Sequence, residues 1–154
     1  MLRLLLASLH ILALGIGLGA VWVRARALRG AIDRFSLQRA FTADTLWGVA
    51  ALIWIGTGLW RLFGETEKTI AYYMTNHVFF MKMGFFVLIL VLEIWPMATL
   101  MRWRVAAARG GSAESAANPA AARRIAAVSY IEAALVVAMV FVAVAMARGY
   151  GARG

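Results

Sequence analysis

LLLASLHILALGIGLGAVWV, residues 4–23, is a run of mostly apolar residues interrupted by the polar side chains Ser8 and His10. A helix that spans a bilayer requires about 20 mostly apolar residues. Three further runs of this kind follow at residues 43–63, 78–101 and 125–147. The sequence therefore predicts an all-α integral membrane protein, a four-helix bundle in which residues 1–154 form a single membrane domain.

The composition also indicates a membrane protein. Hydrophobic residues make up 64% of the chain and charged residues 15%, whereas about 25% of the residues of a soluble domain are charged. Little of the chain lies outside the apolar runs, so we expect no separate soluble domain. There is no cysteine, which excludes disulfides, thiolate nucleophiles, cysteine-ligated iron–sulfur clusters and covalently attached c-type haem.

The net charge of +9 is distributed unevenly along the chain. The segments after the first and third runs carry Arg24, Arg26, Arg29, Arg34, Arg39, Arg102, Arg104, Arg109, Arg123 and Arg124. The opposite side carries only Arg3, Arg61, Lys68, Arg148 and Arg153. Because cytoplasmic loops hold the excess of Lys and Arg, we expect both termini outside and a multi-pass protein of a bacterial inner membrane. The bilayer accounts for the charge, so no nucleic-acid role is predicted.

The basic segment 29–40 is predicted to form a short interfacial helix in the first cytoplasmic loop, with its arginines at anionic headgroups. The apolar side chains expected to face lipid are Ile32, Phe35 and Leu37. The second membrane helix is then expected to start at Thr42 or Asp44, with Asp44 acting mainly as a helix N-terminal group.

Ionisable groups at membrane depth are rare and are candidate functional residues. His10 and Lys82 both lie in the outer halves of their runs, at roughly the same depth. A neutral imidazole is a common haem or metal ligand, so His10 is a candidate metal ligand, or alternatively a hydrogen-bonding group between helices. Lys82 either extends its ammonium outward to the interface or points into the bundle, where it would pair with an anionic group such as a porphyrin propionate.

Two carboxyls lie deeper in the apolar runs. Glu93 follows Lys82 by eleven residues, which places both on nearly the same helix face. Glu132 lies at about the same depth in the fourth run. The two carboxyls are predicted either to form a proton relay or to pair with Arg24 or Arg26, and pairing is the favoured interpretation.

Gly15 and Gly19 form a GxxxG pair in the first run. Small residues at this spacing allow helix backbones to approach closely in lipid. We expect the pair to serve packing within the four-helix bundle. A dimer interface and room for a flat cofactor are the alternatives.

Two stretches carry a resemblance to known families. LHILALGIGLGAVWVRARALR, residues 9–29, places a histidine in the first helix and a basic motif after it, and NHVFFMKMGFF, residues 76–86, opens the third helix. Over nearly its whole length the chain resembles an uncharacterised family of bacterial four-helix predicted membrane proteins. It is similar, more distantly, to HemJ-type protoporphyrinogen oxidases and to the membrane domain of CopD-like copper-resistance proteins.

The resemblance to HemJ-type proteins implies a role for three residues. These proteins carry a histidine in the first helix, an arginine just after it and a lysine early in a later helix, which correspond here to His10, Arg24 (or Arg26) and Lys82. By this resemblance the three residues would contact haem b or a porphyrin. The further histidine that HemJ-type proteins carry near the end of the first cytoplasmic segment has no counterpart in this chain.

Three hypotheses on function follow. The first is a redox-type protein that binds haem b or a porphyrin through His10, with Lys82 and Arg24 at the propionates. In this hypothesis Glu93 or Glu132 would handle protons. The second is a non-catalytic accessory or assembly subunit, as a homodimer or with other membrane chains. The third is an oligomeric transporter or channel.

Overall fold

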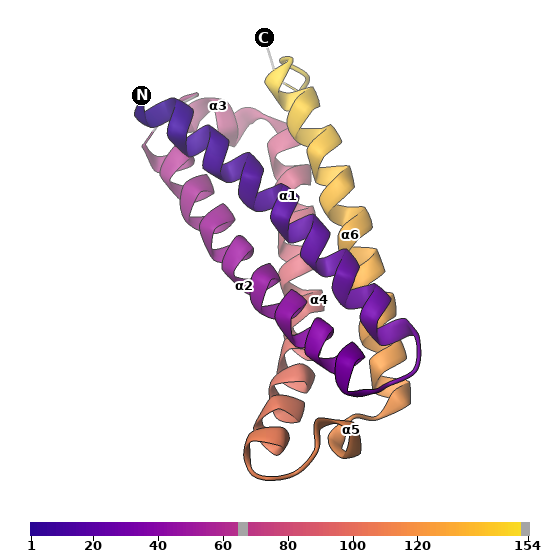
Figure 1. Ribbon diagram of the computed structural model, residues 1–154. Coiled ribbons are helices and arrows are strands. Elements are labelled where there is room, and N and C mark those ends of the chain that lie inside the picture. The colour runs from indigo at the N-terminus through magenta and orange to yellow at the C-terminus, as the bar shows by residue number, and fades with distance from the viewer. Residues whose placement is uncertain (65–67, 152–154) are drawn as a thin grey trace.

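The protein is a bundle of long helices. A computed structural model describes residues 1–64 and 68–151, and within them it contains six helices and no strand. The helices are α1 (Leu2–Arg29), α2 (Arg34–Phe63), α3 (Ile70–Thr75), α4 (His77–Ala108), α5 (Ala113–Ala116) and α6 (Pro119–Ala147) (Figure 1). Helices α1, α2, α4 and α6 are long and apolar enough to cross a membrane. The prediction of an all-α membrane bundle with four spanning helices is therefore confirmed.

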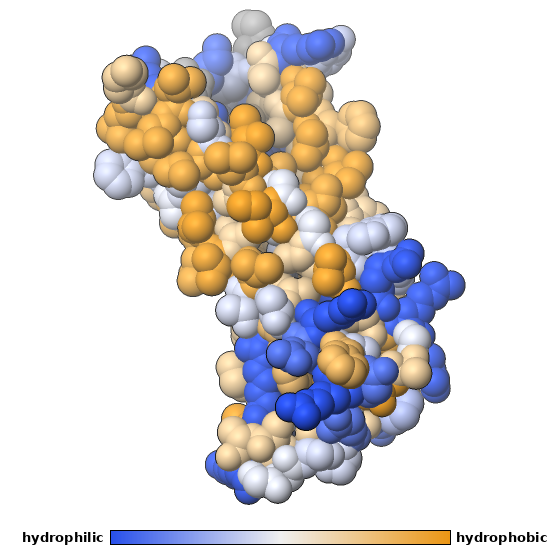
Figure 2. All heavy atoms as spheres, viewed as in Figure 1, coloured by the Kyte–Doolittle hydropathy of each residue, from blue (hydrophilic) through white to orange (hydrophobic). Residues whose placement is uncertain are grey.

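The four long helices alternate in direction, so both chain ends lie at the same end of the bundle (Figure 1). At the opposite end each helix extends beyond its apolar run. The extensions are residues 24–29 of α1, 34–42 of α2, 102–108 of α4 and 119–124 of α6. At 1.5 Å per residue they lengthen the bundle by roughly 9–13 Å. Most of the arginines belong to this end, which is rich in hydrophilic side chains in Figure 2; Arg153, assigned to the other side, lies outside the described residues.

Two apolar clusters hold the bundle together. The central cluster consists of Ala20, Val21, Trp47, Ile89, Ala133, Val136 and Met139. The end cluster consists of Leu28, Leu37, Ala40, Leu100, Trp103, Ala117, Ala122, Ile125 and Ala126. Members of the end cluster come from all four extensions or lie next to them. Burial of these side chains, each worth about 1.5–3 kcal/mol for a large residue, explains why the helices continue past their apolar runs.

Segment 29–40 does not form a separate interfacial helix. Helix α1 runs through Arg29, and Asp33 caps the start of α2, so residues 34–40 are the first two turns of that helix. Phe35 is exposed, as expected, but Leu37 is 1% exposed and belongs to the end cluster. The segment therefore folds onto the bundle because its apolar residues find partners there.

Helices α2, α4 and α6 begin at side-chain caps. Asp33, Asn76 and Asn118 each accept hydrogen bonds from backbone N–H groups in the first turn of their helices, which satisfies donors that have no partner within the helix. The backbone N–H of Ser36 donates to Asp33 and lowers the pKa of this exposed carboxyl. The cap thus stabilises α2 at neutral pH, and this contribution is lost as the pH falls through the lowered pKa.

Helix α1 organises the packing. It packs along α2 on one side and α6 on the other, and α4 packs along α6 (Figure 1). Helices α2 and α4 have little contact with each other. The bundle is therefore closed on three sides and loosely joined on the fourth.

The GxxxG pair does not take part in this packing. Gly15 and Gly19 are exposed, and a Cβ atom added to either would meet nothing within 4 Å. Gly17 between them is buried, and a Cβ there would lie 3.0 Å from the Trp47 ring. The expectation that the pair serves packing within the bundle is therefore wrong; the glycine required for close approach is Gly17.

We predict that Asn76→Ala lowers the free energy of unfolding by about 2–4 kcal/mol. Asn76 is fully buried, accepts from the backbone N–H of Val78 at 2.9 Å and donates from its amide to the carbonyl of Tyr150 at 3.3 Å. The substitution removes a helix cap, worth about 1 kcal/mol. Because the Val78 N–H that loses its acceptor is buried, the loss costs about 1–3 kcal/mol more. The measurement is chemical or thermal unfolding in detergent.

Asn118→Ala is the matched control. Asn118 caps α6 in the same geometry, accepting from Ala120 at 2.8 Å, but it is exposed. Its loss should cost only the cap, about 1 kcal/mol. Equal effects of the two substitutions would contradict the role given to the burial of the Asn76 cap.

Candidate functional site: a buried charge cluster and a lateral crevice

A single arginine joins all four long helices. Arg24 lies in α1 and its side chain is 0% exposed. Its Nε donates to Ser129 Oγ of α6 at 2.9 Å. Its Nη1 donates to Asp44 Oδ1 of α2 at 2.9 Å and to Glu93 Oε1 of α4 at 2.6 Å. Its Nη2 donates to Glu93 Oε2 and to Glu132 Oε2, both at 2.7 Å. All five N–H groups of the guanidinium are therefore satisfied.

A second arginine completes this group on the side of the end cluster. Arg104 Nη2 donates to Asp44 Oδ2 at 2.9 Å and also to the backbone carbonyl of Phe41. Asp44 thus bridges Arg104 and Arg24. We call the set of Arg24, Asp44, Glu93, Arg104, Ser129 and Glu132 the Arg24 cluster. It contains three carboxyls and two guanidiniums.

The Arg24 cluster forms a polar layer between the two apolar clusters. In α1, Arg24 follows Val21 of the central cluster and precedes Leu28 of the end cluster. In the other three long helices Asp44, Glu93 and Glu132 likewise each lie between a residue of one cluster and a residue of the other, in reversed chain order in the antiparallel helices α2 and α6. Each helix therefore contributes one charged residue at the same level of the bundle.

The geometry decides three expectations about these residues. Glu93 and Glu132 are paired with Arg24, as the favoured interpretation had it. Asp44 is not mainly a helix N-terminal group, because α2 begins ten residues earlier at Arg34 and the Asp44 carboxylate binds two arginines. The role of Arg24 at a cofactor propionate does not fit, since the guanidinium is buried and all its donors are used within the chain.

A crevice lies between α2 and α4, on the loosely joined side of the bundle. It consists of two adjoining cavities of about 100 and about 60 Å³ that share the walls Trp54, Ile55 and Phe86. The larger cavity is lined by His10 and Lys82, and the smaller one reaches Glu93. Leu59 and Leu90 line the crevice and are 49% and 43% exposed. The crevice therefore opens on the side of the bundle, where lipid surrounds a membrane protein.

His10 is held by neighbours on α2. Its Nδ1 lies 2.9 Å from Thr57 Oγ1, and its ring stacks on Trp54 with centroids 5.3 Å apart. The Thr57 hydroxyl donates to the carbonyl of Ile53 at 2.7 Å, so its oxygen accepts from the imidazole. This assigns the proton to Nδ1 and leaves a lone pair on Nε2. Gly58 makes room for the ring, because a Cβ there would lie 3.2 Å from His10 Cε1.

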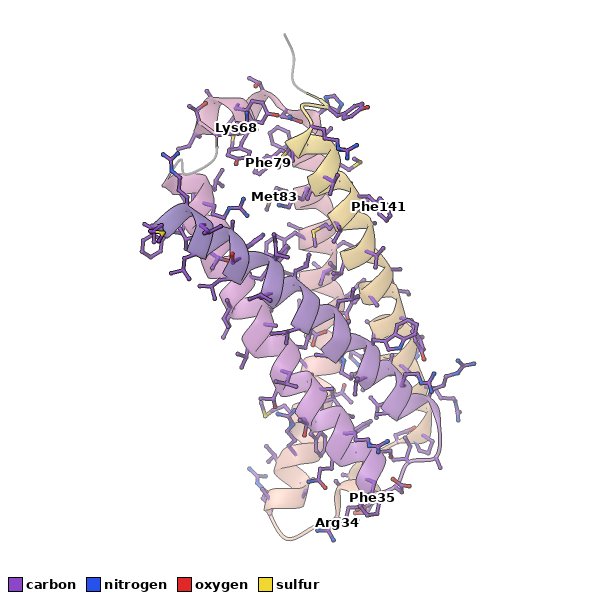
Figure 3. The ribbon with its side chains drawn as sticks, turned by 45° about the horizontal axis from the view of Figure 1, so that its top comes forward. Arg34, Phe35, Lys68, Phe79, Met83 and Phe141 are labelled. Carbon is purple, nitrogen blue, oxygen red and sulfur yellow. The ribbon has the colours of Figure 1, made fainter. Side chains whose placement is uncertain are left out.

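Two further polar groups belong to the walls of the crevice. The indole N–H of Trp54 is buried without a hydrogen-bond partner in the described part of the chain. Lys82 lines the same cavity as His10, so the two residues predicted to lie at equal depth are brought together. Phe79 and Met83 complete the wall on α4 near the end that carries both termini (Figure 3). Lys82 and Glu93 both line the crevice, which confirms the prediction that they share a helix face.

The crevice does not fit a haem or porphyrin as it stands. Pockets for ligands of drug size measure about 300–1,000 Å³, several times the volume beside His10. An artificial cavity of about 150 Å³ accepts one benzene ring, so the two adjoining cavities match a single ring and not four. Within the described residues there is also no group of three or more His, Asp or Glu side chains that could hold a metal ion.

The sequence alone did not identify Thr57, Trp54, Ser129 or Arg104 as parts of these sites. Ser129 could have been found, because it precedes Glu132 by three residues and shares its helix face. No signal in the chain order points to Thr57 as the partner of His10, because hydroxyls in membrane helices commonly bond to their own backbone. Arg104 was assigned to a loop because it follows the third apolar run.

One family of proteins matches the chain. A family model described as "Predicted membrane protein (DUF2214)" matches residues 2–151, nearly the whole chain. No curated protein matches the chain, and no solved structure does. The similarity to HemJ-type and CopD-like proteins therefore stays an expectation from the sequence.

We predict that Arg24→Lys lowers the midpoint of thermal unfolding in detergent by about 5–15 °C. A lysine has three donors in place of five and cannot bind Glu93 with two parallel hydrogen bonds. Each buried acceptor left without a partner costs about 1–3 kcal/mol, and about 1 kcal/mol corresponds to 2–4 °C in a chain of this size.

Arg26→Lys in the same helix is the control, because Arg26 is exposed. It should shift the midpoint by less than about 2 °C. If the two substitutions had equal effects, the Arg24 cluster would not be the main polar contact of the bundle.

Proposed function

The chain belongs to this family of predicted membrane proteins, and we propose that it binds a lipid-soluble molecule with a single-ring head group in the crevice between α2 and α4. The observation that carries the proposal is a set of polar groups in the walls of an otherwise apolar crevice. These groups are the Nε2 lone pair of His10, the indole N–H of Trp54 and the ammonium of Lys82. Polar groups that converge on an apolar pocket are typical of ligand sites.

The chemistry of the walls narrows the class of ligand. Trp54, Phe79 and Phe86 provide aromatic faces for a flat ring. The donors on Trp54 and Lys82 suit oxygen acceptors on that ring. The lateral opening beside Leu59 and Leu90 allows a long apolar tail to remain in the lipid. A quinone or phenol head on an isoprenoid or alkyl tail has all of these properties.

The test is binding of a short-chain ubiquinone to the purified protein in mild detergent. Binding is measured as quenching of tryptophan fluorescence. We expect saturable binding that weakens about tenfold or more in Lys82→Met, since a hydrogen bond to a charged group is worth about 1.5–3 kcal/mol, and about two- to tenfold in Trp54→Phe, since a neutral hydrogen bond is worth about 0.5–1.5 kcal/mol. Trp60→Phe and Lys68→Met are the controls; Trp60 is 58% exposed and Lys68 lies over the Tyr72 ring, away from the crevice. Binding that is absent, or equally strong in all variants, would overturn the proposal.

A haem b or porphyrin redox role is the alternative proposal, supported by the free Nε2 of His10 beside Lys82. It requires α2 and α4 to move apart, because the cavity is too small for a tetrapyrrole. The visible spectrum of the same preparation, oxidised and then reduced with dithionite, tests it. A Soret band that disappears in His10→Ala would favour haem over a quinone-like ligand, and a spectrum without such a band would remove this alternative.

A role as a subunit of a larger assembly is the second candidate, and one observation favours it. The GxxxG pair of Gly15 and Gly19 is exposed on α1 and unused within the chain. Small residues at this spacing commonly join membrane helices.

The site of action would be a bacterial inner membrane, with the arginine-rich end in the cytoplasm, as the charge asymmetry supports.

We predict that Gly19→Leu disrupts self-association through this face. The measurement is the mass of the detergent-solubilised protein by light scattering, and the wild type is expected to form a dimer that the substitution converts to a monomer. Gly56→Leu is the control, because Gly56 on α2 is likewise exposed and free of contacts. A monomeric wild type would contradict the prediction.

A further inference from the structure

The Arg24 cluster contains more acid than base. We propose that it is a binding site for one proton, held on Glu132 and exchanged through Glu93. This inference does not depend on the ligand proposed for the crevice. The titratable, charged and polar groups around Glu132 in this cluster are Arg24 from α1, Asp44 from α2, Glu93 and Arg104 from α4, and the neutral hydroxyl of Ser129 on α6; of these, Arg24 bonds to Glu132 directly.

The Arg24 cluster is not neutral when all its groups are ionised. Two guanidiniums face three carboxyls, so a fully ionised cluster would hold one uncompensated negative charge. A buried charge without a counter-charge is strongly unfavourable. One bound proton makes the cluster neutral.

The hydrogen bonds identify the carboxyl that carries the proton. Asp44 has an arginine partner on each of its oxygens, and so does Glu93. Glu132 accepts from Arg24 on Oε2 only, and its Oε1 is buried without a partner among the described residues. The Glu132 side chain is 0% exposed. A buried carboxylate anion with one oxygen unpartnered is more costly than a buried neutral carboxyl in the same place, so the proton belongs on Glu132.

The exposure of the carboxyl side chains in the Arg24 cluster indicates the route by which the proton on Glu132 exchanges. Glu93 and Glu132 both accept from the same Nη2 atom of Arg24, so their carboxyls are neighbours. Glu93 is 16% exposed and lines the crevice, whereas Glu132 is closed off from it. A proton reaches or leaves Glu132 through Glu93. Asp44 and Arg104 lie on the side of the arginine-rich end, and neither is hydrogen-bonded to Glu132.

The first test is infrared spectroscopy of the wild-type protein in lipid at neutral pH. A protonated carboxyl has a C=O stretching band above the amide bands that shifts in D₂O, and an ionised carboxyl has none there. We expect such a band in the wild type and in Glu114→Gln, a carboxyl of α5 outside the cluster, and its loss in Glu132→Gln. A wild type without the band, or a band that persists in Glu132→Gln, would overturn the proposal.

Stability gives a second, independent readout. Glutamine is a neutral isostere of protonated glutamate, so Glu132→Gln should unfold within about 2 °C of the wild type. Glu93→Gln removes the charged partner of Arg24 and should lower the midpoint by about 5 °C or more. If Glu132→Gln is destabilised as much as Glu93→Gln, or does not fold, Glu132 is ionised in the native protein and the inference fails.

Discussion

The hydrogen bonds of one guanidinium determine how the four helices meet. A buried arginine is tolerated only when its charge and all its donors are satisfied, and here the partners of Arg24 come from α2, α4 and α6. The N–H groups of the planar guanidinium point in fixed directions, so they can donate to these partners in only one arrangement of the helices. Sliding any helix by one turn, about 5.4 Å, would remove its contribution. The two apolar clusters supply most of the burial, and the polar layer between them determines the register at which they form.

The same arrangement explains why the fourth side of the bundle is open. Helix α1 makes close contacts with two neighbours. The side chains of α2 and α4 meet in the end cluster, at the bond between Arg104 and Asp44, and in the walls of the crevice. Bulky rings on both helices, Trp54 on α2 and Phe86 on α4, are in edge-to-face contact with centroids 5.4 Å apart and prevent closer approach. The crevice therefore begins at His10 and Lys82 and ends at Glu93. It connects the proposed ligand site to the Arg24 cluster.

The sequence was sufficient for the parts of the structure that the bilayer determines. Apolar runs of spanning length predicted the four helices, and the helical repeat placed Lys82 and Glu93 on one face. The cost of a charge at membrane depth favours pairing of Glu93 and Glu132 with Arg24 or Arg26, and the partner is Arg24. The helix extensions could not be found in this way, because hydropathy marks where lipid ends and not where helices end. For the same reason hydropathy places Arg24 and Arg104 in loops. It places Leu37 at the lipid surface, because most of the partners of Leu37 in the end cluster lie far from it in the sequence. The bond between His10 and Thr57 depends on the rotation of two helices about their axes, which residue spacing within each helix does not determine.

The distribution of the Arg24 partners along the chain has a consequence for biogenesis. Helices α1 and α2 leave the ribosome first, and at that stage Arg24 has only Asp44 available as a charged partner. Glu93 arrives with α4, and Glu132 and Ser129 arrive with the last helix. Until then only one of the five N–H groups of Arg24 has its partner in the chain, the one that donates to Asp44. Helix α6 therefore supplies the last two acceptors of Arg24, and a chain that stops before α6 leaves two N–H groups of this guanidinium without the partners they have in the complete bundle.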